Sequence, residues 1–414
     1  MTFLRSSNLG EKIMIGFTKL ICGLATVAEA MRQDQCEEGT SPRLLQFSSH
    51  DRPLVVWNTT NRCNLRCLHC YIQAEDRTYK NELSTEEARA MIDDLAQMQV
   101  PVLLFSGGEP LLRQDLFELG AYATQKGIRS VISSNGTLIT PETAKKIKDA
   151  GFRYVGISID GSEKTHDHFR KMDGAFKKAL EGVRNSLQAG VMSGIRFTVN
   201  RHNYADLPEI LDVCEKEKIP RFCLYHLVYA GRGKEMVSDD ITPDETREMV
   251  RMLIEKAKDW CKRGVDTEIL TTDNHADGIF IKKYLEETEP ERAEEVTTLL
   301  NMHGGCSAGT KMSNIDPFGN VHACQFWSHV TLGNIRERRF SEIWRDPDNP
   351  ILQKMRKKAD FLKGRCGDCT YVNLCAGCRI RAEVVHGDAW AEDPACFLTE
   401  EEIKGRSLVE SHLP

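Results

Sequence analysis

Three cysteines in the stretch NRCNLRCLHCY, residues 61–71, have a spacing that suits a metal centre. Cys63, Cys67 and Cys70 follow the pattern C-x3-C-x2-C. A closed tetrahedral site needs four ligands, so a zinc site would require a distant fourth ligand such as His69. Three thiolates at this spacing suit a [4Fe–4S] cube better, because three irons are then bound and the fourth iron stays open.

Seven further cysteines lie toward the C-terminal end, in a region with little apolar periodicity. They are Cys306, Cys324, Cys366, Cys369, Cys375, Cys378 and Cys396. Such a loop-rich region predicts a small module that metal stabilises, with a zinc ribbon over 366–378 as the alternative. Fifteen cysteines in 414 residues, an odd number in a long chain, favour reduced thiols in a cytoplasmic enzyme over a secreted disulfide framework.

The elements that must position these thiols start at residue 54, where short apolar runs alternate with helical patterns. The runs are 54–60, 102–109, 129–136, 154–161, 194–201 and 221–229, and the helical patterns are 84–99, 114–126, 141–150, 174–189, 206–218 and 243–262. This alternation predicts βαβ units and a parallel sheet. A Rossmann sheet is the alternative, but no G-x-G-x-x-G follows the first run. We therefore predict an α/β fold with a partial (β/α)6 TIM-like barrel and a C-terminal cysteine-rich auxiliary iron–sulfur domain.

Polar residues gather where the predicted strands end. Cys63 follows the first run, Glu109 ends the second, Asn135 follows the third and Asp160 the fourth. In barrels of this kind the chemistry takes place at the carboxyl ends of the strands. The sequence therefore predicts one site at that end.

These motifs, in this order, resemble the radical S-adenosylmethionine (SAM) enzymes. The resemblance implies that the first three cysteines hold the radical-generating [4Fe–4S] cluster. It also implies a set of SAM-binding residues: Tyr71, Gly107, Gly108, Glu109, Ser134, Asn135, Ser158, Asp160 and Arg170. In the family, the Gly-Gly-Glu edge binds the amino group of SAM, and an arginine placed like Arg170 binds the carboxylate.

The resemblance also implies a mechanism. SAM chelates the open iron, the reduced cluster breaks the C5′–S bond, and a 5′-deoxyadenosyl radical takes a hydrogen atom from the substrate. A low-potential electron donor such as flavodoxin or ferredoxin is the implied partner. The remaining task of the barrel is to position SAM and exclude water.

The C-terminal cysteines are similar to the SPASM extension of radical SAM proteins, which holds auxiliary [4Fe–4S] clusters. The resemblance implies that Cys366, Cys369, Cys375 and Cys396 close one cluster. It assigns Cys306, Cys324 and Cys378 to another cluster with an open or non-cysteine fourth ligand. The sequence departs from the SPASM pattern in having C-x2-C at 375–378 and no extra cysteine between 306 and 324. The sequence therefore leaves open whether this region holds one auxiliary cluster or two.

Longer stretches, such as LYHLVYAGRG (224–233) and CAGCRIRAEVVHGDAWAEDPAC (375–396), look like the enzymes of sirohaem-dependent haem and haem d1 biosynthesis. Those enzymes act on didecarboxysirohaem. One branch removes its two acetate side chains to give iron-coproporphyrin III, and the other removes propionates on the way to haem d1. We favour the acetate branch. Basic and histidine residues are candidates to contact the carboxylates or the iron of such a substrate, namely Arg201, Arg232, Lys234, His202 and His226.

Two other functions compete. A radical SAM peptide maturase commonly carries an N-terminal leader-binding domain, for which residues 1–50 look too short. A non-catalytic iron–sulfur protein would not explain a site with only three cysteines beside a Gly-Gly-Glu strand.

Composition and hydropathy bound the remaining possibilities. The net charge is −6 with both signs spread along the chain, which gives no nucleic-acid footprint. No apolar run reaches the roughly 18 residues of a membrane span. Residues 13–30 resemble a signal peptide, but Lys19 interrupts the apolar run, so we predict an amphipathic helix or strap.

The sequence divides into five expected parts. These are an N-terminal strap (1–50), the radical SAM core (51–265), a helical linker (266–305), the auxiliary cluster domain (306–398) and a C-terminal tail (399–414).

Overall fold

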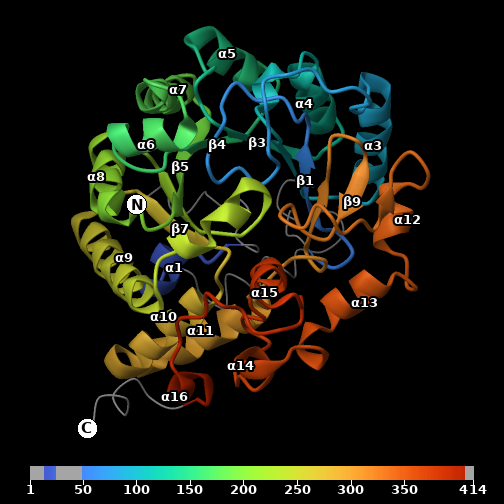
Figure 1. The fold of residues 1–414 in the computed structure, drawn as a ribbon. Coiled ribbons are helices and arrows are strands. Elements are labelled where there is room, and N and C mark those ends of the chain that lie inside the picture. The colour runs from blue at the N-terminus through green and yellow to red at the C-terminus, as the bar shows by residue number, and fades with distance from the viewer. Residues whose placement is uncertain (1–13, 25–48, 406–414) are drawn as a thin grey trace, which may run out of the picture.

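The computed structural model describes residues 14–24 and 49–405; residues 1–13, 25–48 and 406–414, which hold most of the expected N-terminal strap and part of the tail, lie outside this description. Its centre is a ten-stranded sheet with the order β10-β9-β8-β1-β2-β3-β4-β5-β6-β7. The sheet is parallel from β8 through β1 to β7, and it does not close between β10 and β7. The α/β fold with a parallel barrel-like sheet is confirmed (Figure 1).

All six predicted strands are present, and the sheet extends beyond them. The strands are β1 (Leu54–Asn58), β2 (Val102–Ser106), β3 (Arg129–Ser134), β4 (Tyr154–Ser158), β5 (Met192–Val199), β6 (Arg221–His226), β7 (Glu268–Thr272), β8 (Met312–Ile315), β9 (Asn320–His322) and β10 (Gly333–Asn334). β7 lies in the segment that we expected to be a helical linker. Its sequence, EILTT, is too polar for apolar patterning to predict that all five residues are buried.

Each predicted helical pattern of the core corresponds to a helix that begins within two residues of the expected position, and one further helix, at 163–170, was not predicted. They are α3 (Thr85–Gln97), α4 (Leu116–Gln125), α5 (Pro141–Asp149), α6 (Glu163–Arg170), α7 (Ala175–Gln188), α8 (Leu207–Lys216) and α9 (Pro243–Arg263). Ser84, Thr140 and Thr242 are the N-caps of α3, α5 and α9, and each side chain accepts a backbone hydrogen bond from the third helical residue. Such caps satisfy amide groups that the helix itself leaves without partners.

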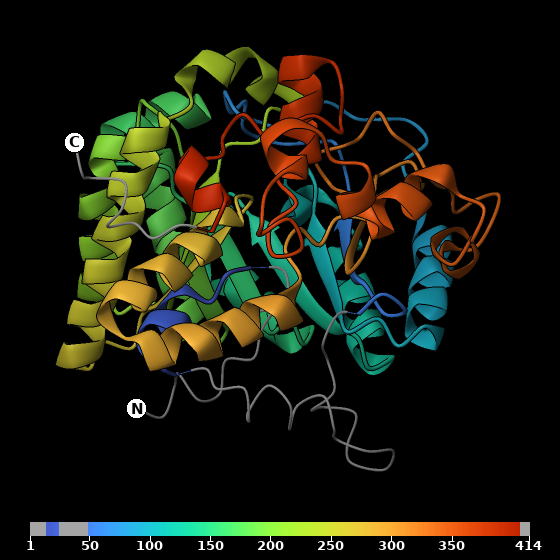
Figure 2. The ribbon, with the colours of Figure 1, turned by 90° about the horizontal axis from the view of Figure 1, so that it is seen from below.

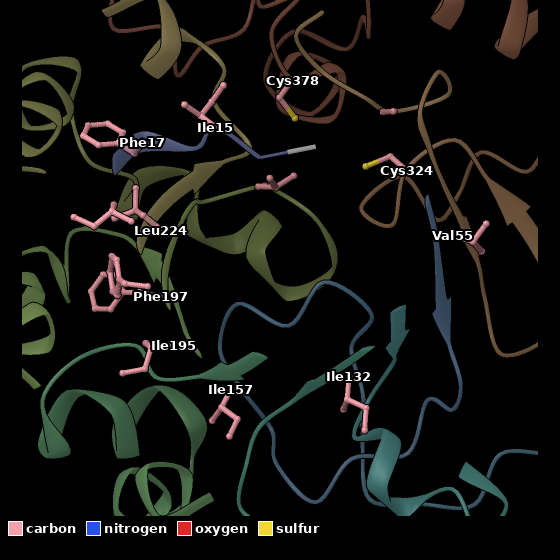
Figure 3. Close-up of a cluster of buried hydrophobic side chains, with 14 of the residues drawn as sticks. Ile15, Phe17, Val55, Ile132, Ile157, Ile195, Phe197, Leu224, Cys324 and Cys378 are labelled. Atoms are coloured by element: carbon pink, nitrogen blue, oxygen red, sulfur yellow. The ribbon is translucent and has the colours of Figure 1, made fainter. Parts of the chain in front are cut away.

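Alternation along the strands separates two apolar faces. Val55, with Ile132 and Ile157 on β3 and β4, packs toward the helices in the main core (Figure 3). Leu54 and Val56 belong to a smaller cluster on the opposite, inner face of the sheet. Because successive side chains of a strand point to opposite faces, one set of strands builds both the core and the wall of an interior.

The N-terminal segment closes one edge of the sheet. Ile15 forms an isolated antiparallel bridge with Thr271 of β7, and α1 (Phe17–Ile21) is fully buried beside it. The Lys19 ammonium lies 3.3 Å from the Glu268 carboxylate, which also binds Arg221. The described part of this segment is therefore a strap packed on the barrel.

The remaining helices connect the two sides of the sheet. They are α10 (Ala276–Thr288), α11 (Pro290–His303), α12 (Phe340–Trp344), α13 (Pro350–Arg356), α14 (Gly364–Gly367), α15 (Arg379–His386) and α16 (Glu400–Ile403). β8 pairs with β1 on one side, whereas Arg381 donates to the carbonyls of Leu227 and Asp273 on the other. Figures 1 and 2 show these orange and red elements across the side of the sheet that the core helices leave open. The C-terminal region thus covers the interior.

Candidate active site

The loop with the first three cysteines is anchored to the Gly-Gly pair after β2. The Gly108 amide donates to the Thr60 carbonyl over 2.7 Å, and the Glu109 amide donates to the Arg62 carbonyl over 2.8 Å. Gly107 has a φ of +132°, and a Cβ there would lie 2.6 Å from the Thr60 carbonyl oxygen. The glycines are thus required for a close backbone approach that holds the start of the cysteine loop.

The three thiols of this loop line one cavity, which we call the first cavity. The Cys63 sulfur accepts the Leu65 amide at 3.4 Å, and the Cys70 sulfur accepts the Ala74 amide at 3.4 Å. Burial raises the pKa of the Cys63 and Cys67 thiols. Three thiols around one cavity, with backbone donors aimed at the sulfurs, fit a cluster that takes three protein ligands.

Two side chains from later in the chain also donate to these sulfurs, one from the end of α6 and one from the residue after β3. The Arg170 guanidinium lies 3.4 Å from the Cys67 sulfur, and the side-chain amide nitrogen of Asn135 lies 3.8 Å from the Cys63 sulfur. Hydrogen bonds to cluster sulfurs are one of the protein's means of setting a reduction potential.

Glu109 lies behind the wall of the first cavity. Its side chain is fully buried. Its carboxylate accepts hydrogen bonds from the Ser134 hydroxyl and from the Asn135 backbone amide, each at 2.8 Å. Burial raises the pKa of Glu109 to about 7, against these hydrogen bonds. The carboxylate therefore ties the end of β2 to the end of β3.

Asp160 has the same kind of position behind Arg170. It forms a buried ion pair with the Arg170 guanidinium and accepts the Thr198 amide at 2.8 Å. Burial alone would raise the pKa of Asp160, but the Arg170 charge holds it below its ordinary value. The ion pair fixes the guanidinium beside the Cys67 sulfur.

The structure brings most of the predicted SAM-binding residues together. Those that line the first cavity are Tyr71, Gly107, Gly108, Ser134, Asn135, Ser158 and Arg170. The Tyr71 hydroxyl donates to the Asn58 side chain at 2.9 Å, and its ring meets the Phe326 ring edge-on. Glu109 and Asp160 do not line this cavity, and each instead holds a residue that does.

The second group of cysteines divides in space. Cys306, Cys324 and Cys378 come from three separate segments and line a second cavity. Figure 3 shows the sulfurs of Cys324 and Cys378 pointing toward one another. Three convergent thiols again fit a cluster with one ligand position left to another group.

The other four cysteines, Cys366, Cys369, Cys375 and Cys396, line a third cavity. Three of their sulfurs accept backbone amides: Cys366 from Asp393 at 3.3 Å, Cys369 from Tyr371 at 3.4 Å and Cys375 from Gly377 at 3.5 Å. Four thiols around one small space are the donor set of a closed [4Fe–4S] site. The Cys306 amide donates to the Cys375 carbonyl at 3.1 Å, so the two auxiliary sites share a backbone contact.

The first and second cavities meet inside the barrel. Six residues line both: Arg196, Tyr225, Val228, Asp273, Gln325 and Phe326. The second cavity holds about 1250 Å³ of empty space and the first about 1030 Å³, part of it open to solvent. Together they form a chamber between two sets of three thiols.

Sequence reasoning missed Arg196 and Asp273. The signal for Arg196 was available, since an arginine stands inside the apolar run GIRFTVNR (194–201). Asp273 follows the unexpected strand β7 and has a φ of +69°. Burial raises the pKa of Asp273 to about 6.

The basic residues and histidines that we expected to contact the substrate lie in different surroundings. Arg232 donates to the Cys67 carbonyl at 2.7 Å and so supports the cysteine loop. His226 lines the first cavity, with its Nε2 2.9 Å from the Asp277 carboxylate. Arg201, His202 and Lys234 line neither the first nor the second cavity.

Comparisons with known proteins agree with this geometry. Residues 57–214 match the radical SAM superfamily, and residues 306–379 match the SPASM iron–sulfur cluster-binding domain. The chain is 49% identical to the Fe-coproporphyrin III synthase of Methanosarcina barkeri, over 94% of this chain and 99% of that protein. The chain belongs to the radical SAM enzymes. As a radical SAM enzyme with a SPASM region, it uses a [4Fe–4S] cluster, SAM and auxiliary iron–sulfur clusters.

Other relatives of this radical SAM enzyme are more distant. It is 41% identical to the pre-heme d1 synthase of Dinoroseobacter shibae, over 89% of this chain and 91% of that protein. Identity to the mycofactocin maturase MftC of Mycobacterium tuberculosis is 29%, over 90% of each chain.

Solved structures share the fold. Native anSMEcpe with bound AdoMet has a TM-score of 0.66 at 20% identity, covering 84% of this chain and 95% of that one. Streptococcus suis SuiB bound to S-adenosylmethionine has a TM-score of 0.66 at 18% identity, covering 90% of this chain and 80% of that one. None of the helices within residues 14–24 and 49–405 combines the length and apolar character needed to cross a membrane.

Proposed function

We propose that this protein removes the two acetate side chains of didecarboxysirohaem and so forms iron-coproporphyrin III. The observation that carries the proposal is the 49% identity to an Fe-coproporphyrin III synthase along 94% of the chain. The identity to a pre-heme d1 synthase is lower, at 41% over 89% of the chain. The acetate branch is therefore favoured over removal of propionates.

The first cavity is the proposed site of radical formation. A [4Fe–4S] cluster with one open iron supplies the electron that cleaves SAM to a 5′-deoxyadenosyl radical. Cys63, Cys67 and Cys70 would hold that cluster. Asn135 and Arg170 would donate to its sulfur ligands.

The residues around these thiols would bind SAM. Gly107 and Gly108 let the backbone approach the cofactor, and Ser134 and Ser158 present hydroxyls at the ends of neighbouring strands. We assign Glu109 a positioning role, because its carboxylate is occupied by Ser134 and Asn135. Asp160 has the same role toward Arg170.

The chamber suits a flat substrate with an apolar face. Leu54, Val56, Val102, Leu104 and Val131 line its wall on the inner face of the sheet. Pockets for small molecules are mostly apolar with a few polar groups that set orientation. A tetrapyrrole lying against this wall would have the radical site on one side and the second set of thiols on the other.

The auxiliary region is assigned by the spatial grouping of its cysteines. Cys306, Cys324 and Cys378 would hold one [4Fe–4S] cluster, and the four cysteines of the third cavity would hold another.

We also propose the five-part division of the chain given by the sequence, except that β7 belongs to the barrel and not to the linker. We also propose a cytoplasmic setting and reduction by flavodoxin or ferredoxin, since the cluster requires a low-potential donor.

Anaerobic reconstitution with SAM, dithionite and didecarboxysirohaem tests the proposal. Mass spectrometry should show a product that has lost both acetates and kept its propionates, with 5′-deoxyadenosine formed alongside. Loss of propionates with retention of the acetates would instead assign the protein to the haem d1 branch. Deoxyadenosine formation with an unchanged tetrapyrrole would contradict both branches and direct the search to a peptide substrate.

A further inference from the structure

Arg196 lies at the junction of the first and second cavities. It stands on β5 directly opposite Ser158 of β4, and its guanidinium borders both spaces. Within the described part of the chain, no Asp or Glu side chain forms an ion pair with it. A partly buried cation that faces a cavity without a paired anion is a candidate for binding one.

The surroundings hold this guanidinium in place. Its Nη1 donates to the Ser133 hydroxyl, and its charge lies 5.8 Å from the centre of the Tyr225 ring. A Cβ on Gly156 would lie 2.2 Å from its Nε, so this glycine makes room for the arginine. The Nε is buried and has no hydrogen-bond partner among the described residues.

Neighbouring arginines differ from it. Arg170 is paired with Asp160, and Arg221 is paired with Glu268 at 2.6 Å. Arg379 donates to backbone carbonyls at 2.7 and 2.9 Å. Arg170 and Arg221 thus have carboxylate partners, whereas the acceptors of Arg379 and Arg196 are neutral. Arg379 lines only the second cavity, and of these four arginines Arg196 alone borders both cavities without a carboxylate partner among the described residues.

Asp273 is the acid that faces the same junction. It is close enough to interact electrostatically with Arg196, but it lies beyond ion-pair distance. Its Oδ2 is buried and lacks a hydrogen-bond partner in the described residues. The Arg196 charge is thus left for a third group that enters the chamber.

We propose that Arg196 binds a side-chain carboxylate of the iron tetrapyrrole and so sets how the substrate lies in the chamber. This inference rests on the proposed function. Ser133 and Ser158, its neighbours on β3 and β4, line the first cavity. A carboxylate held by Arg196 would therefore place its own side chain on the radical side of the chamber. Guanidinium groups bind carboxylates with two parallel hydrogen bonds, which fixes direction as well as affinity.

Binding measurements on the cluster-loaded protein test this. The probes are iron-coproporphyrin III and its tetramethyl ester, which share a macrocycle but differ in free carboxylates. Absorbance titration should show that Arg196→Gln weakens binding of the acid about tenfold or more, equivalent to about 1.4 kcal/mol, and leaves binding of the ester unchanged. Arg196→Lys should fall between the wild type and Arg196→Gln, because lysine keeps the charge without the planar fork.

Two variants serve as controls. Arg201→Gln removes an exposed arginine that lines neither cavity and should change neither affinity. Asp273→Asn removes a negative charge facing Arg196 and should leave binding of the acid equal or tighter. Equal weakening of acid and ester by Arg196→Gln, no weakening by it, or weaker acid binding in Asp273→Asn would overturn the proposal.

SAM also carries a carboxylate, so its affinity is measured in parallel by equilibrium dialysis. Arg196→Gln should leave SAM affinity and iron content at wild-type values. Loss of SAM affinity with unchanged tetrapyrrole binding would assign Arg196 to SAM and contradict the inference. A wild-type protein that binds neither tetrapyrrole would contradict the proposed function itself, which is a different outcome from a failure of the variant alone.

Discussion

Gly108 packs directly on the backbone of Arg62. A Cβ at Gly108 would lie 2.1 Å from the Arg62 carbonyl oxygen, closer than real Cβ contacts come. The turn after β2 and the loop that carries the three cysteines therefore pack together only because Gly108 has no side chain. This contact makes the integrity of the first thiol site depend on a residue that holds no metal.

Gly108→Ala should displace the cysteine loop and remove the first cluster while leaving the auxiliary clusters. The iron and sulfide content should fall by about one cluster per chain, and SAM cleavage should be lost. Gly127→Ala is the control, because a Cβ there meets nothing within 4 Å. That control should keep its full iron content at a modest loss of stability from its positive φ. Full iron in Gly108→Ala would contradict the packing argument.

Replacing the three cysteines of the first site by alanine should abolish deoxyadenosine formation and remove about four irons per chain. Cys378→Ala should instead keep radical-site iron and lose iron from the second cavity. Mössbauer spectra of the two variants, recorded on matched preparations, should be complementary. Identical spectra would mean that the two sets of thiols do not hold separate clusters.

Glu109→Gln should destabilise the fold by about 1–3 kcal/mol, since an amide group replaces one of two buried acceptors. The Ser134 hydroxyl and the Asn135 amide each donate to this carboxylate. Denaturant unfolding measures the change, and SAM affinity should fall with it as the end of β3 shifts. An unchanged stability with lost SAM affinity would show that Glu109 contacts SAM itself.

Asp393→Asn should destabilise the auxiliary region by about 3–5 kcal/mol, because it leaves a buried arginine without its partner. The Asp393 carboxylate accepts from Arg381 at 2.8 and 2.9 Å and from the Cys378 amide at 2.7 Å. The backbone amide of Asp393 donates to the Cys366 sulfur, so a shift of this segment should cost iron at both auxiliary sites. Asp388→Asn, at an exposed pair with Lys363, should change stability by less than about 1 kcal/mol.

Local patterns were sufficient where a strand or helix carries its own signal. The six apolar runs are all found in the structure as strands, and Ser84, Thr140 and Thr242 cap three of the helices that follow. β7 could not be found in this way, because its burial comes from α1 and β6 and not from an apolar sequence. Strand periodicity reports only what a segment contributes to a core, and a polar segment buried by its neighbours leaves no such trace.

The sequence by itself predicted the chemistry of the first site, because three cysteines at C-x3-C-x2-C supply three ligands and would leave one iron of a [4Fe–4S] cube free. It also determined the order of strands that brings the later polar residues to the same edge. Only the tertiary structure decided that Glu109 and Asp160 stand behind the cavity wall and that Arg196 and Asp273 face the chamber. The physical reason is that burial and charge pairing depend on neighbours far away in the chain, which spacing along the chain does not encode.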